Sequence, residues 1–288
     1  MKGKEGKNTI KKTTVKGHVS WIIACVLAAF WLLITILPFI FMVLNSFKDK
    51  FEMLVKGIFQ LPDKFNTTNY SEVLNGRFFH YFMNSIIVLT ISLVVLLFIS
   101  ACAAYPLARF KFRLNGFIYG LIVACMSIPI HITLIPVFKL SKSIGLYDAI
   151  WALIGPYIAF GIPISVFILT SFMKEIPKEI EEAAAIDGCS RFRMFFSVIL
   201  PLSKPGLSTL AIYNGVTMWN EFSFAYTLTQ SPEARTLPLA VWDFQGQYSM
   251  NIPMIMAVLT LTILPMIILY IFMQEKLVKG MMAGAVKG

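Results

Sequence analysis

The residue types that could perform a specific task gather in one polar segment, 174–204. Its first half combines carboxylates with small residues: Glu182, Ala183, Ala184, Asp187 and Gly188. Acidic side chains suit the positive end of a helix, alanines propagate it, and Gly188 is placed to stop it. A short helix of this kind offers charges and close approach to a partner. These residue types fit helix-in-groove recognition, and the alternative is a solvated amphipathic loop on the membrane surface.

The second half of the same segment predicts another short helix at an angle to the first. Ser190 can cap it, and an apolar stripe recurs at helical spacing on Phe192, Phe195, Phe196 and Ile199. Pro201 and Pro205 are expected to end this helix and lead into the next apolar run. Arg191 and Arg193 lie where lipid phosphates or acidic groups of a partner could meet them.

Nothing in the sequence predicts catalysis. The four cysteines (Cys25, Cys102, Cys125 and Cys189) lack metal-ligand spacing, and no Gly-x4-Gly-Lys-Ser/Thr phosphate loop occurs. We find no constellation of nucleophile and base either. We therefore expect no catalytic residue, no metal site and no cofactor in this chain.

The elements that must position the polar segment are membrane spans. The chain of 288 residues is 57% hydrophobic and 14% charged, with a mean hydropathy of +0.74. Apolar runs of the length that a bilayer requires cover 19–47, 81–108, 117–138, 149–173, 205–232 and 252–274. The sequence thus predicts an all-α membrane protein with six transmembrane helices. Prolines should kink the third near its outer end and make the fourth irregular.

The distribution of positive charge predicts the orientation. Most of the 25 Lys and Arg residues lie in the first tail, in the loops 106–116 and 173–204, and in the last tail. By the positive-inside rule both termini are cytoplasmic. We expect a basic cytoplasmic tail over 1–18 and a single six-helix domain over 19–288, in contact with membrane lipid. The same distribution accounts for the net charge of +10 without nucleic acid.

Polar groups inside a span are candidates for a transport pathway. Glu221 and Asn220 lie inside the fifth predicted span, and Asn84 opens the second. An ionisable group in a membrane is costly unless it meets a partner or water. These three residues could line the pathway; hydrogen bonding between helices is an equally good interpretation for Asn220 and Glu221.

The spacing of the polar segment resembles a known family. Glu182-Ala183-Ala184, three residues, Gly188, nine residues and Val198-Ile199-Leu200-Pro201 resemble the cytoplasmic "EAA" loop of ABC importer permeases, with Val198 where isoleucine is usual. Three further stretches resemble the maltose-type carbohydrate subgroup: Phe82 to Ser85, Ala104 to Phe110, and Trp219 to Phe222. The terminal Gly284 to Gly288 does so as well.

The resemblance implies a type I importer permease fold in a bacterial or archaeal cytoplasmic membrane. It also implies that 174–204, including Leu200 and Pro201, couples to a dimer of ATP-binding cassette subunits. Further partners would be a second permease subunit, different or identical, and an extracytoplasmic sugar-binding protein. The alternatives are an ABC permease for a non-sugar solute such as a polyol phosphate, an ion-driven secondary transporter and a membrane-bound enzyme. A lone intramembrane acid and no inverted repeat disfavour the secondary transporter.

Overall fold

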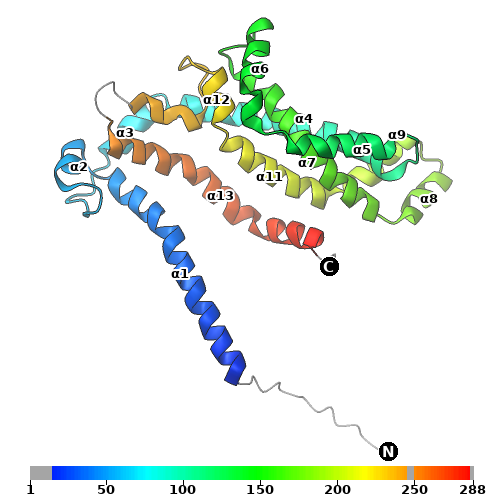
Figure 1. The fold of residues 1–288 in the computed structure, drawn as a ribbon, viewed down its shortest axis with the longest axis horizontal. Coiled ribbons are helices and arrows are strands. Elements are labelled where there is room, and N and C mark those ends of the chain that lie inside the picture. Colours follow the sequence, from blue (N-terminus) through cyan, green and yellow to red (C-terminus); the bar gives the residue numbers. More distant parts are fainter. Residues whose placement is uncertain (1–14, 245–249, 286–288) are drawn as a thin grey trace, which may run out of the picture.

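The protein is almost entirely helical. The computed structural model describes residues 15–244 and 250–285, and no strand occurs among them. Five long helices dominate it: α1 (Val15–Ser46), α4 (Phe78–Arg109), α7 (Ile154–Glu175), α11 (Lys204–Trp219) and α13 (Ile252–Ala285). α4 packs along α7, and α11 lies against both (Figure 1). The expected basic tail over 1–18 falls mostly outside the described residues.

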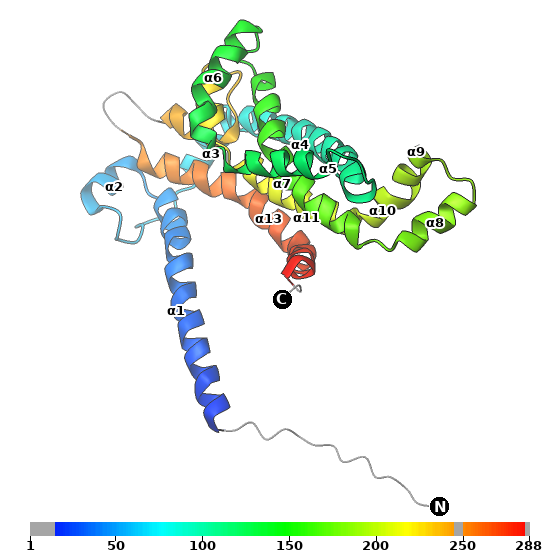
Figure 2. The same ribbon diagram turned by 45° about the vertical axis from the view of Figure 1, so that its right-hand side comes forward.

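Helix α1 stands apart from the other helices. Figures 1 and 2 both show it meeting the bundle at its C-terminal end and diverging from it toward the N-terminus. Its apolar window is 0% buried, while Asn45 and Ser46 at its end are buried. Two short helices follow, α2 (Lys50–Lys56) and α3 (Thr68–Asn75). Asn69 of α3 donates to the carbonyl oxygens of Ser46 and Lys48, which fixes the end of α1.

The third apolar run is broken more sharply than the sequence predicts. It forms α5 (Asn115–Ala124), the 3-10 turn η1 (Cys125–Ser127) and α6 (Ile130–Ser143), and the two halves meet at 97°. The cause is Pro129, which holds the preceding Ile128 in an extended conformation with ψ of 113°. Pro136 lies inside α6 without ending it. The expected kinked helix is therefore a pair of helices.

The fourth run is more regular than the sequence predicts. After the 3-10 turn η2 (Ile150–Leu153), α7 continues without a break to Glu175 although Pro163 lies within it. Gly161 explains why a small residue is needed here. A Cβ atom at this position would lie 2.5 Å from Cδ2 of the fully buried Leu96 on α4 and 3.1 Å from Oδ1 of Asn214 on α11. Gly161 thus allows three helices to approach closely.

The polar segment and the fifth run form a chain of short elements around α11. They are α8 (Lys178–Ile186), α9 (Arg191–Met194), the π-helical turn η3 (Phe195–Ile199), α10 (Leu200–Leu202), α11, α12 (Ser223–Leu228) and the 3-10 segment η4 (Leu237–Phe244). The predicted fifth helix, 205–232, is too long: α11 ends at Trp219. The carboxylate of Glu221 accepts from the backbone N–H groups of Phe224 and Ala225 and so starts α12 as a separate helix.

Membrane spans can be counted in two ways. Four helical stretches are long and apolar enough to cross a membrane: Ser20–Ser46, Phe78–Arg109, Ile150–Glu175 and Ile252–Phe272. Two bent pairs bring the number to six if each pair is one span, and the second pair, bent by 69°, joins Arg191–Leu202 to Lys204–Trp219. The residues 191–202, expected in the cytoplasmic loop, therefore belong to the same apolar unit as α11.

Candidate functional site

The first half of the 174–204 segment folds as the sequence predicts. Helix α8 carries Glu179 and Glu181 in its first turn and ends at Ile186. Gly188 follows in the left-handed conformation, with φ of +77°. Its N–H donates to the carbonyl of Ala185 and that of Cys189 donates to the carbonyl of Ala184, which is the paired bonding of a Schellman turn. Gly188 is therefore the residue that turns the chain out of α8.

A buried ion pair ties α8 to the end of α4. Arg109 Nε lies 2.5 Å from Glu181 Oε1, and the two side chains are 4% and 19% exposed. Arg109 Nη2 also donates to the carbonyl of Ile176, at 2.7 Å. Sequence reasoning counted Arg109 as a cytoplasmic charge and as part of the Ala104 to Phe110 stretch, and it missed this contact. The available signal was its position at the close of the second apolar run, where an arginine can reach an acid on a neighbouring loop.

The second half of the segment is anchored by aromatic packing. Ser190 caps α9 by accepting from the N–H of Arg193, as expected. Phe195 and Ile199 are buried against α4 and α7, and the Phe195 ring lies 5.2 Å from that of Tyr105. The predicted stripe is nevertheless split: Phe192 is 76% exposed. The π-turn, in which Leu200 N–H donates to the carbonyl of Phe195, widens the helix just before Pro201.

The outward side of α8 carries both charge and apolar area. The exposed residues of α8 and of the turn after it are Glu182, Ala183, Asp187 and Gly188, whereas Ala184 is half-buried against the core. Farther along the segment, Leu200 is half-buried and Pro201 is exposed. Ile186 is 87% exposed at the end of the helix. Figures 1 and 2 show α8 and α9 projecting together at one end of the bundle. A short helix held rigidly at its base and uncovered at its tip is suited to insertion into a groove.

Of the three pathway candidates, Glu221 alone lines a cavity. The cavity measures about 270 Å³ and lies between the η1–α6 bend, α7, α11 and α12. Tyr157 donates to Glu221 Oε2 at 3.0 Å, so this carboxylate also joins α7 to α12. Asn220 is exposed and donates to the carbonyl of Val216 in its own helix. A larger recess, of about 570 Å³, lies among residues 49–66 and is distant in the chain from these groups.

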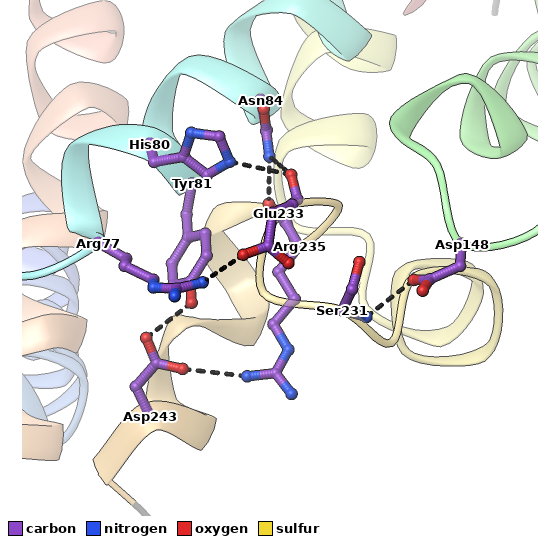
Figure 3. Close-up of polar contacts among 9 residues, drawn as sticks. All are labelled: Arg77, His80, Tyr81, Asn84, Asp148, Ser231, Glu233, Arg235 and Asp243. Carbon is purple, nitrogen blue, oxygen red and sulfur yellow. Dashed lines mark hydrogen bonds and ion pairs between the residues drawn. The ribbon is translucent and has the colours of Figure 1, made fainter.

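Asn84 lies in a different polar cluster, drawn in Figure 3. Its Nδ2 donates to the carbonyls of Glu233 and Arg235, at 3.0 and 2.8 Å. Neighbouring side chains on the same side of α4 hold the same segment: Arg77 pairs with the Glu233 carboxylate at 2.9 Å, and His80 bonds its carbonyl. The amide hydrogens of Asn84 are thus directed at the backbone of the 229–244 segment and not at the cavity.

Two further acids complete this cluster (Figure 3). Asp243 accepts from Tyr81 at 2.7 Å and pairs with Arg235 at 3.0 Å. Asp148 Oδ1 accepts from the N–H groups of Gln230 and Ser231, at 2.7 and 2.8 Å. Burial is the largest influence on Asp148 and opposes its charge, but the N–H groups of Ser231 and Gln230, the Ser231 side chain and the charge of Arg235 together lower its pKa. The cluster clamps the 229–244 segment to α4 and to the loop after α6.

The pKa of Glu233 is lowered as well. Its own backbone N–H is the main cause and the Arg77 guanidinium the next.

Sequence reasoning missed the cluster because the predicted second span began at residue 81 and so left Arg77 and His80 in a loop. Polar residues at i, i+3, i+4 and i+7 before an apolar run were the signal that a helix begins earlier.

Comparisons with known proteins agree with this architecture. Residues 97–283 match the family model described as binding-protein-dependent transport system inner membrane component. An ABC transporter permease from Caldicellulosiruptor sp. (strain Rt8B.4) is 56% identical over 90% of this chain and 94% of its own length. A permease of a transport system for starch degradation products from Thermoanaerobacterium thermosulfurigenes is 34% identical over 96% of this chain and 100% of its own.

A solved structure supports the fold independently. It is a bacterial ABC transporter involved in the import of the acidic polysaccharide alginate, with a TM-score of 0.76 at 23% identity, covering 91% of this chain and 98% of that one. The family match covers α8 to α11, where the buried anchor and the exposed tip of the 174–204 segment lie. The chain belongs to the binding-protein-dependent transport system inner membrane component family.

Proposed function

We propose that this chain is the permease subunit of an ATP-driven importer of sugars, in the form of oligosaccharides. As a member of its family it is a multi-pass protein of the cytoplasmic membrane, and its relative from Thermoanaerobacterium serves a system for starch degradation products. The observation that carries the proposal is the 174–204 segment: a short helix with an exposed tip, fixed at its base by the Arg109–Glu181 pair.

The tip of this segment is the proposed contact with the ATPase. Glu182, Ala183, Asp187 and Gly188 would enter a groove on an ATP-binding subunit. The half-buried Ala184 and Leu200 hold the segment against the core, and the exposed Pro201 leads into α11. Ile186, 87% exposed, adds apolar area at the tip. Because Arg109 joins α8 to the end of α4, a movement of the tip is transmitted to a long helix as a rigid-body shift. ATP hydrolysis is assigned to a dimer of ATP-binding subunits.

The second permease subunit, identical or different, is proposed to cover α1 and the polar face of α11. Side chains along most of α1 are exposed, from Trp21 to Ile40. Tyr213, Thr217 and Asn220 are exposed on α11. A polar face of this kind is unsuited to lipid and suited to a pathway between two subunits. Asn220 and Glu221 are the proposed pathway residues, and Asn84 is proposed to act through the segment that it holds.

Six crossings with both termini in the cytoplasm complete the proposal. This topology requires each bent pair to be one span, so that 191–202 opens the fifth crossing. It places α8 and the turn at Gly188 on the ATPase side, and it puts the Asn84 cluster and the 229–244 segment on the outer side. The description of the family supports a binding protein as one partner. We propose that it is an extracytoplasmic sugar-binding protein, which would deliver the cargo to this outer side.

Reconstitution tests the proposal. The tagged chain is purified from its native membranes in mild detergent with its partners, identified by mass spectrometry, and the complex is placed in vesicles. Uptake of labelled maltotriose and other neutral oligosaccharides is then measured with and without ATP. Uptake that requires ATP and the binding protein is expected. Recovery of the chain alone, with uptake driven by an ion gradient, would overturn the proposal in favour of a secondary transporter.

A further inference from the structure

Helix α11 presents a polar face that the described chain leaves uncovered. Tyr213 is 52% exposed, Thr217 and Asn220 are exposed, and their spacing of i, i+4 and i+7 places them on one side. Among the described residues, no hydrogen bond to the Tyr213 hydroxyl is found. Helix α1 differs, because its exposed side chains such as Leu33 and Leu37 are apolar. Val216 is exposed on the same face, and Thr217 and Asn220 each donate to a carbonyl of α11 itself. Within an apolar spanning unit, the Tyr213 hydroxyl is therefore the group of this face that suits water or a polar cargo.

The cavity of about 270 Å³ adjoins this face. α11 contributes Tyr213 and Thr217, and α7 contributes the rings of Tyr157 and Phe160. Apolar and aromatic walls with a few polar groups are the usual lining of a small-molecule site. Among the described residues that line the cavity, Glu221 is the one charged side chain, and Lys, Arg and His are absent from that lining.

The surroundings of Glu221 define which cargo it can accept. Its carboxylate receives three donors: the N–H of Phe224 on Oε1, and the N–H of Ala225 and the hydroxyl of Tyr157 on Oε2. A carboxylate offers about four acceptor positions, so Oε1 keeps capacity for one more donor. A sugar hydroxyl supplies that donor. A phosphate, sulfonate or uronate group supplies acceptor oxygens and a like charge, which is repelled at close range.

We propose that this cavity is a sugar subsite of the pathway and that Glu221 restricts it to uncharged sugars, excluding phosphorylated, sulfonated and uronic acid sugars. The inference rests on the proposed function and narrows its substrate class. The fold alone does not decide the point, because the solved importer of similar fold serves an acidic polysaccharide. What decides the point is the lining of the cavity, in which the carboxylate of Glu221 is the one charged group among the described residues.

The charge selectivity of the cavity can be measured with charged thiol reagents, without knowing which sugar is carried. Thr217→Cys is made in a chain whose four native cysteines are replaced by serine, and the importer with its partners is placed in vesicles. Reaction rates are compared for a cationic trimethylammonium-ethyl and an anionic sulfonato-ethyl methanethiosulfonate, each divided by its rate with a free thiol. We expect the cationic reagent to react at least about tenfold faster after this correction, which corresponds to about 1.4 kcal/mol. Adding Glu221→Gln should bring the ratio close to one.

Two controls separate charge from access and folding. An uncharged hydroxyethyl reagent should react with Thr217→Cys at the same rate with and without the Glu221→Gln substitution, and Leu37→Cys on α1 should react with none of the reagents. A corrected ratio near one with Glu221 intact, or no reaction at Thr217→Cys, would overturn the proposal. Such a result would overturn the charge selectivity of the cavity without contradicting ATP-driven sugar uptake. Conversely, a failure of ATP-driven uptake would overturn the proposed function without changing the measured ratio of reagent rates.

Discussion

The guanidinium of Arg109 at the end of α4 lies 2.5 Å from the carboxylate of Glu181 on α8, and both side chains are largely buried. The pair links the base of the exposed α8 tip directly to a 32-residue helix, Phe78–Arg109. Under the proposed function, a rigid connection of this kind is what a transporter driven by a separate ATPase requires, because a loop that only flexed would not move the helices.

Arg109→Met is expected to destabilise the protein strongly. Removing one partner of a buried pair leaves an uncompensated charge, which costs about 3–5 kcal/mol. The double variant Arg109→Met/Glu181→Met should recover most of this loss, because an apolar pair of similar size replaces the ions. Thermal unfolding in detergent measures both. Equal unfolding midpoints for the wild type and Arg109→Met would contradict a buried, paired arginine.

The double variant should retain its fold but couple ATP to transport less well. Arg109→Met/Glu181→Met restores packing but lacks the hydrogen bond from Arg109 to the carbonyl of Ile176. We expect it to fold, to hydrolyse ATP within its complex and to take up sugar more slowly per ATP than the wild type. Uptake at the wild-type ratio would show that the ion pair serves stability alone.

Gly188→Ala should weaken the turn after α8. The left-handed conformation at φ +77° costs an alanine about 1–2 kcal/mol, although no neighbouring atom would clash with its Cβ. Gly188→Asn is the matched control, since asparagine visits this region far more readily. Membrane insertion of both should be normal, as measured by protein in the membrane fraction. Uptake should fall for alanine and be largely kept for asparagine, and the reverse order would contradict the role of the turn.

Gly161→Ala should destabilise the contact of α4, α7 and α11. Its Cβ would lie 2.5 Å from Leu96, which is fully buried, and overpacking of this kind typically costs about 1–3 kcal/mol. Gly120→Ala in α5 is the control, because nothing lies within 4 Å of its Cβ. Its unfolding midpoint should stay equal or rise slightly, since alanine favours helices. A similar midpoint for both variants would contradict the close approach at Gly161.

Asp148→Asn should loosen the 229–244 segment in a pH-dependent way. The pKa of Asp148 is lowered on folding, so its charge stabilises the fold above the unfolded value of 3.8, and this contribution is lost as pH falls through the folded value. From about pH 8 to about pH 5 the free energy of unfolding of the variant should be lower than that of the wild type by a constant amount, the deficit. Below about pH 4 the deficit should shrink. A deficit that is unchanged at about pH 3 would contradict a charge effect.

Much of this architecture follows from local features of the sequence. The runs at 19–47, 81–108 and 252–274 fall on α1, α4 and α13, which extend beyond them at one or both ends. The match arises because an uncharged stretch of this length in a membrane folds as a helix. Gly188 and Ser190 were identified as helix signals because a stop and a cap are decided by the residue itself. These local rules account for the exposed half of the 174–204 segment.

The remaining features depend on residues far apart in the chain. The 97° bend at Pro129 and the regularity of α7 around Pro163 are decided by packing, which periodicity does not report. Glu221 was noticed as an intramembrane acid, but its bonds to Tyr157 and α12 require the fold. Asn84 was grouped with the pathway because its type and position fit, whereas its amide is directed at two carbonyls of a distant segment.

Photo-crosslinking from the tip of α8 tests the central claim most directly. Benzoylphenylalanine is placed at Ile186, which is 87% exposed, and as a control at Ile132 on α6, which is 71% exposed. The importer is irradiated in native membranes, and the products are identified by mass spectrometry. We predict a product between position 186 and an ATP-binding subunit, and none from position 132. Failure of position 186 to reach that subunit, in a complex that still takes up sugar with ATP, would contradict coupling through this segment.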